Sequence, residues 1–75
     1  MNELETLLSE LEQHIMDNDY STAKKSAMAI MTKGLSKDPA VAEKVKAIHA
    51  SLSYEDPRLT VVNTVCNLLG VKIGK

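Results

Sequence analysis

Cys66, His14 and His49 are the residues whose types could supply a nucleophile, a general base or a metal ligand. Cys66 is the single cysteine, so it cannot form a disulfide within the chain, and no Cys/His cluster has the spacing of a zinc site. It lies in a mostly apolar run, where a thiol usually packs as a small hydrophobic group. We therefore predict that Cys66 is an inert packing residue and that the chain holds no metal.

The sequence contains no recognisable catalytic motif, and its two histidines have a structural interpretation. His14 and His49 each fall about 80° from the centre of a predicted apolar helix stripe, so we expect them to close edges of the core. No paired-carboxylate motif or nucleophile elbow is present, and three glycines do not form a phosphate-binding loop. We predict a protein that is not an enzyme, with no catalytic residue, no cofactor and no small-molecule substrate.

The most informative pattern is a row of uncharged polar residues near the C-terminus. No charged residue occurs between Arg58 and Lys72. The polar residues in this interval recur at i, i+3, i+4 and i+7, which places them on one helix face: Thr60, Asn63, Thr64 and Asn67. Solvated helix faces normally carry Lys and Glu, whereas the centre of a protein interface is depleted of charge. The row therefore predicts a partner-binding surface, and the alternative is packing within the fold or simple exposure.

Charge is unevenly distributed although the formal net charge is only -1. The first nineteen residues contain six acids and no base: Glu3, Glu5, Glu10, Glu12, Asp17 and Asp19. The rest of the chain contains an excess of lysine. Either the acids neutralise basic neighbours within the fold, or two faces of opposite sign meet different partners. In the second case Glu3, Glu10 and Glu12 would attract a basic partner.

Length and composition limit the fold to one domain over residues 1–75. A chain of this size buries only about 60% of its unfolded surface, so we expect a partner or oligomerisation to contribute to stability. An apolar fraction of 44% and a charged fraction of 25% fit a globular protein. Two tyrosines without Phe or Trp exclude an aromatic platform for single-stranded nucleic acid. We find no signal peptide and no membrane span, and therefore expect a cytoplasmic location.

Capping residues and apolar spacing predict an all-α fold, a compact bundle of four short helices over about 3–16, 20–33, 39–52 and 57–69. Asn2 and Glu5 form a capping box, and Gly34 followed by Leu35 marks the end of the second helix. Asp-Pro pairs open the third and fourth helices. Residues 71–73 alternate apolar and charged side chains, which predicts a short extended tail. The inward residues expected for the second helix are Ala23, Ala27, Ile30 and Met31.

Two elements leave alternatives open. The fourth helix is rich in β-branched residues, so a strand is the alternative there, although the residues do not alternate. Met16, Met28 and Met31 cluster around the first helical hairpin. We expect them to fill gaps in a core without aromatic residues, and an adaptable binding surface is the other interpretation.

Residues 48–73 resemble the C-terminal helices of Xre-type helix-turn-helix proteins, including small antitoxins. The run DPRLTVVNTVCNLLGVKI is similar to the closing helix of that family, in which a proline opens the helix and a Leu-Gly-Val triplet closes it. The resemblance implies a DNA-binding regulator in which Lys44, Lys46 and His49 face the major groove. The reading motif itself is not evident, because Pro39 to Leu52 predicts one uninterrupted helix.

Two functions follow from these patterns. The first is a small protein-binding module, a regulator, inhibitor or immunity-type factor, whose partner is another protein or a second copy in a homodimer. The second is an Xre-like transcriptional regulator that binds DNA through a basic ridge, and its affinity would fall steeply with salt. The ridge would consist of Lys24, Lys25, Lys33, Lys44 and Lys46. Neither function involves a membrane.

Overall fold

The chain forms four helices in a computed structural model, which describes residues 2–73. Their bounds are Glu3–Met16 for α1, Tyr20–Thr32 for α2, Pro39–Ser51 for α3 and Arg58–Leu69 for α4. The predicted all-α bundle is confirmed, and each boundary lies within one residue of the prediction. The strand alternative for the last element is wrong, since Arg58–Leu69 is helical. Residues 71–73 form the short non-helical tail.

Carboxylate and amide side chains cap the N-termini of the first three helices by accepting backbone hydrogen bonds. The Asn2 side chain accepts a hydrogen bond from the Glu5 N–H at 2.8 Å, and the Glu5 carboxylate accepts one from the Asn2 N–H at 3.2 Å. Asp19 caps α2 and Asp38 caps α3, where Pro39 occupies the first turn. Each contact satisfies a backbone donor that has no partner inside the helix. The sequence signals of helix entry therefore correspond to real hydrogen bonds.

Three of the helices end in the same backbone motif. In α2 the Leu35 N–H donates to the Ile30 carbonyl at 3.0 Å while Gly34 adopts φ +74°. In α4 Gly70 and Val71 repeat this Schellman arrangement. In α1 the left-handed residue is Asn18, with φ 57°, and not glycine. Glycine adopts this conformation without cost, whereas a side chain with a Cβ is strained there.

Asn18 gives a direct test of that strain. The Asn18→Gly variant should be more stable than Asn18→Ala by about 1–2 kcal/mol, because alanine has neither the freedom of glycine nor the local hydrogen bonds of asparagine. Asn18 is exposed, so neither variant removes a core contact. Urea unfolding followed by circular dichroism measures the difference. Equal stabilities of the two variants would contradict the left-handed assignment.

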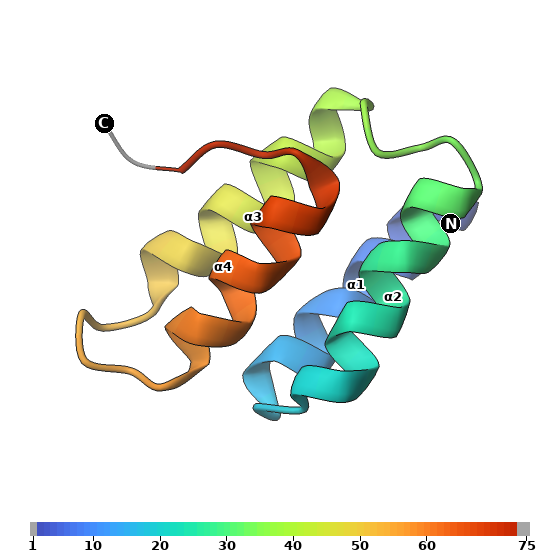
Figure 1. The fold of residues 1–75 in the computed structure, drawn as a ribbon. Coiled ribbons are helices and arrows are strands. Elements are labelled where there is room, and N and C mark those ends of the chain that lie inside the picture. The colour runs from blue at the N-terminus through green and yellow to red at the C-terminus, as the bar shows by residue number, and fades with distance from the viewer. Residues whose placement is uncertain (1, 74–75) are drawn as a thin grey trace.

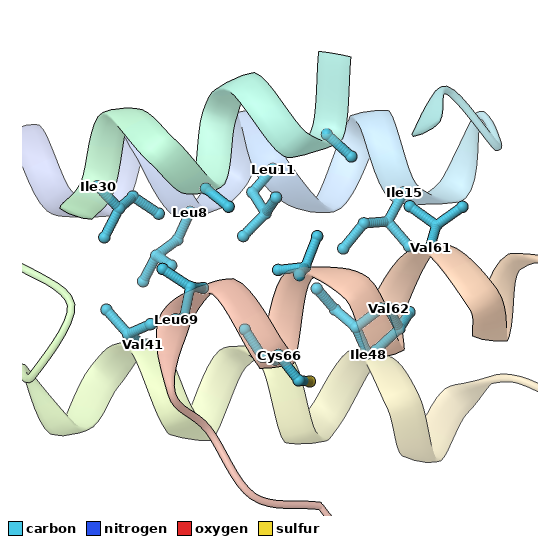
Figure 2. Packing of buried hydrophobic residues seen from close by; sticks show 14 residues of the cluster. Leu8, Leu11, Ile15, Ile30, Val41, Ile48, Val61, Val62, Cys66 and Leu69 are labelled. Carbon is cyan, nitrogen blue, oxygen red and sulfur yellow. The ribbon is translucent and has the colours of Figure 1, made fainter. Parts of the chain in front are cut away.

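The core consists of fourteen buried residues from all four helices, and α4 contributes five of them. All are aliphatic except Cys66. Figure 2 shows Leu8, Leu11 and Ile15 of α1 directed toward α4, and Ile48 of α3 close to Val62. Within residues 2–73 no polar side chain is buried. The fold therefore depends on aliphatic packing, and aromatic residues are not part of its centre.

The helices form two layers. In Figure 1 α2 and α4 lie side by side and run in the same direction, with α1 behind α2 and α3 behind α4. α4 contacts all three other helices, whereas α2 makes no contact with α3. α2 and α3 therefore occupy opposite corners of the bundle. The outer faces of α2 and α4 together form one long side of the molecule.

The prediction for the methionines of α2 is wrong. Met31 was expected inward, but it is 42% exposed, and Met28 is 53% exposed. Ala23, Ala27 and Ile30 make up the buried stripe of α2. Because this stripe is narrow, Met31 lies at its edge and Met28 lies outside it. Neither residue fills a gap in the core, whereas Met16, the third methionine of the prediction, packs against it.

Candidate interaction surface

The uncharged polar row lies on the outer face of α4. Thr60, Asn63 and Asn67 are exposed, and Thr64 is half-buried. The opposite face of the same helix supplies the buried residues Val61, Val62, Val65, Cys66 and Leu69. A regular helix separates these two sets because its period brings i, i+3, i+4 and i+7 together. The four side chains therefore share one solvent-facing surface, which we call the α4 stripe.

Little of the hydrogen-bonding capacity of the α4 stripe is used internally. The Thr64 hydroxyl donates to the Thr60 carbonyl at 3.0 Å, a common local bond for threonine in helices. Among the side-chain hydrogen bonds within residues 2–73, none involves the amides of Asn63 or Asn67. Each amide offers two donor protons and an acceptor oxygen. The stripe can therefore both donate and accept hydrogen bonds.

Exposed apolar side chains lie on the neighbouring helix. Tyr20, Met28 and Met31 of α2 are all more than 40% exposed. The ammonium group of Lys24 sits 4.9 Å from the centre of the Tyr20 ring, a cation–π distance. α2 and α4 are in contact and lie side by side in Figure 1, so these exposed residues belong to the helix next to the one that carries the α4 stripe. Tyrosine and methionine are enriched at interface centres, so these residues are candidates to extend a contact beyond α4.

Two of the three predicted partner-binding acids form ion pairs within the chain. Glu3 contacts Lys33 at 2.8 Å, which joins the start of α1 to the end of α2. Glu12 contacts Lys44 at 2.7 Å, which joins α1 to α3. Glu10 is exposed and makes no ion pair within residues 2–73. Acids of the first segment therefore neutralise basic neighbours within the fold in part, which explains some of the uneven charge distribution.

The five lysines of the predicted basic ridge are divided between two helices. Lys24, Lys25 and Lys33 belong to α2 or its C-terminal cap, and Lys44 and Lys46 belong to α3. α2 and α3 are not in contact. Lys33 and Lys44 also hold carboxylates of α1. α3 is continuous from Pro39 to Ser51, so no turn divides it into two short helices.

The chemically reactive residues lie away from this surface. Cys66 is 4% exposed, and burial raises the pKa of its thiol to about 11. Figure 2 places it on the side of α4 that faces α3. His14 and His49 are half-buried at helix edges, as expected. Within the described chain, no three His, Cys, Asp or Glu side chains approach closely enough to hold a metal ion.

A contact that links distant parts of the chain fixes the start of α4. The Arg58 guanidinium donates to the carbonyl of Met16, the last residue of α1, at 3.0 Å. It also pairs with Asp56 at 2.7 Å, and the Asp56 carboxylate accepts the Arg58 N–H at 2.9 Å. A cation at a helix C-terminus binds otherwise unpaired carbonyl oxygens. Arg58 therefore joins the end of α1 to the beginning of the helix that carries the stripe.

Asp56 should make stability depend on acid. Hydrogen bonds from the Arg58 side chain and backbone lower the pKa of Asp56 from 3.8 to about 2. Above about pH 4 the carboxylate is charged in both states and stabilises the fold; as pH falls toward 2, the unfolded chain takes up the proton first, so the free energy of unfolding decreases. We expect the stability difference between wild type and Asp56→Asn to shrink over this interval.

Urea unfolding at several pH values between 2 and 6 measures this difference. The Glu55→Gln variant is the matched control, because Glu55 is an exposed carboxylate next to Asp56 that makes no ion pair within residues 2–73. A difference that stays constant over the whole pH range would show that the Asp56 contact does not stabilise the fold.

Several surface residues were not predicted from the sequence. Tyr54, in the loop between α3 and α4, is 97% exposed, and Tyr20 is 45% exposed. A turn signal around Asp56 and Pro57 could have indicated that Tyr54 lies outside the core. No local signal predicted the contact of Arg58 with Met16, because these residues are far apart in the sequence.

Comparison with known proteins adds no relative to this description. No protein-family model, no curated protein and no solved structure matches the chain. The similarity to Xre-type proteins stays a prediction. Among the described residues, no helix is both long and apolar enough to span a bilayer.

Proposed function

We propose that this chain is a non-catalytic protein-binding module that regulates or inhibits its partner through the α4 stripe. The observation that carries the proposal is an exposed helix face without a single charged residue. Thr60, Asn63 and Asn67 are exposed and point away from a core that the same helix supplies. A surface of this composition gains more from contact with protein than a Lys- and Glu-rich face does.

The mechanism is recognition by shape and hydrogen bonding. The amides of Asn63 and Asn67 would pair with polar groups of the partner at the centre of the contact, and the apolar side chains of α2 would contribute buried area at its edge. Glu10 is exposed on α1 and would attract a basic partner by its charge. Glu3 and Glu12 are held by lysines, but exposed ion pairs contribute little stability, so a basic partner can compete for them.

The distribution of lysine favours a protein partner over DNA. A sequence-specific DNA-binding protein places its basic residues along one element that enters a groove. Here the candidate lysines are divided between α2 and α3, at opposite corners of the bundle. After Arg58 at its start, α4 has no lysine or arginine with which to bind phosphate.

An affinity experiment tests the proposal. Wild type, the double variant Asn63→Lys/Asn67→Lys and the control Ser9→Lys are immobilised and exposed to a lysate of the source cells. Ser9 is exposed on α1 and is not part of the α4 stripe. We expect a specific set of proteins to bind wild type and Ser9→Lys and to be lost from the double variant. Equal retention by all three folded chains would overturn the proposal.

A further inference from the structure

We propose that the α4 stripe binds a second copy of this chain, so that α4 packs against α4 of another subunit about a two-fold axis. This inference rests on the proposed function, because it names the partner of the same surface. Its first support is chemical. In a two-fold interface every residue near the axis meets its own copy or a close neighbour of it.

Most exposed helix faces carry charged residues, which disfavours packing against an identical face. A Lys or Glu near the axis would face the same charge, and like charges opposed in an interface are strongly unfavourable. Asn and Thr side chains are donors and acceptors at once, so each can pair with an identical residue. Of the four helices within residues 2–73, only α4 lacks charge from its second residue to its end. The stripe is thus self-complementary.

The second support is the area available. A standard protein interface removes about 800 Å² from each partner. That is about one sixth of the accessible surface of this chain, which is 4791 Å². The side formed by α2 and α4 is one of the four long sides of the bundle (Figure 1). A contact centred on α4 therefore reaches the standard size once it covers about one sixth of the surface of the chain.

The third support is the position of the exposed apolar residues. Met28, Met31 and Tyr20 are exposed on α2, the helix that lies beside α4 in Figure 1. A contact centred on α4 that extends over α2 would cover exposed apolar residues at its margin. Methionine suits this position because its flexible side chain adapts to an irregular surface. A small domain with a limited core also gains stability from covering apolar surface by association.

Sedimentation equilibrium of the full chain tests the proposal, with the pair Asn63→Lys and Asn63→Glu. Asn63 lies near the middle of the stripe and therefore near the axis whether the two helices run parallel or antiparallel. We expect wild type to dimerise at micromolar concentration, each variant alone to dissociate at least about a hundredfold more readily, and their equimolar mixture to associate again. Recovery in the mixture shows direct contact and excludes unfolding as the cause.

The controls are Ser9→Lys and Ser9→Glu on the outer face of α1, which should dimerise like wild type. Dimerisation should change little between 50 mM and 500 mM salt, because the contact centre is uncharged. A wild-type chain that is monomeric at about 1 mM overturns the inference. So does a dimer that tolerates both Asn63 variants, or one that salt dissociates steeply, since such a dimer uses another face.

The two proposals can fail separately. A monomeric chain that captures proteins through Asn63 and Asn67 overturns the second-copy inference and leaves the protein-binding function standing. A chain that neither dimerises nor captures protein through the stripe overturns both. If double-stranded DNA is bound with an affinity that falls steeply with salt, the DNA-binding alternative replaces them.

Discussion

Replacing Leu11 by alanine is expected to lower the free energy of unfolding by about 2–5 kcal/mol. Leu11 is completely buried in α1 and is among the largest fully buried side chains. Its truncation removes apolar surface from the core and leaves a cavity that four short helices can close only in part. A domain of 75 residues has a total stability of about 4–11 kcal/mol. The variant should therefore be partly unfolded near physiological temperature.

Leu7→Ala is the matched control for Leu11→Ala. Leu7 lies one turn earlier on the same helix, but it is half-buried and packs only against the edge of the core. Urea unfolding followed by circular dichroism, at one fixed protein concentration, gives both losses. The loss at Leu7 should be clearly smaller. Equal losses would contradict the arrangement of α1, in which Leu8, Leu11 and Ile15 face inward.

The helix limits could be predicted because their signals are local. Asn2, Asp38 and Asp56 accept backbone hydrogen bonds at the helix starts, and Gly34 and Gly70 adopt left-handed conformations at two of the ends. These contacts join residues within a few positions of each other. The residue types alone therefore determine them, and the number and bounds of the helices follow.

Side-chain partners across the bundle could not be predicted in the same way. Glu12 pairs with Lys44, and Arg58 reaches the carbonyl of Met16, because the packing of the helices brings these residues together. Helix packing also explains why the prediction for Met31 is wrong. Helical spacing places Met31 next to the inward stripe, but α2 packs through Ala23, Ala27 and Ile30 and leaves Met31 at the edge.

Part of the candidate surface could be predicted from local sequence signals, and part depends on how the helices pack. The α4 stripe was visible in the sequence, since helical periodicity alone groups its four polar residues, and the structure places Thr60, Asn63 and Asn67 in solvent. The exposure of Met28 and Met31 on the neighbouring helix was not visible, because it depends on which face of α2 packs against α1 and α4. Whether the stripe binds a partner stays a prediction that the affinity and sedimentation experiments test.

Cys66 should react with a thiol reagent such as dithionitrobenzoate at least about a hundredfold more slowly in the folded chain than in urea at pH 8. Burial raises the pKa of the thiol from 9.0 to about 11, which reduces its reactive thiolate form about a hundredfold. The thiol is also 4% exposed, so the reagent reaches it only when α4 separates from α3 or the chain unfolds.

The pH dependence and a second variant complete this experiment. Above about pH 9 the unfolded chain loses the thiol proton while the folded chain keeps it, so the free energy of unfolding should decrease as pH rises toward 11, and this decrease should be absent from Cys66→Ala. Leu11→Ala should accelerate labelling, since it weakens the core that covers the thiol. Equal labelling rates in the folded and urea-unfolded chains would place Cys66 at the surface and contradict the packing of α4.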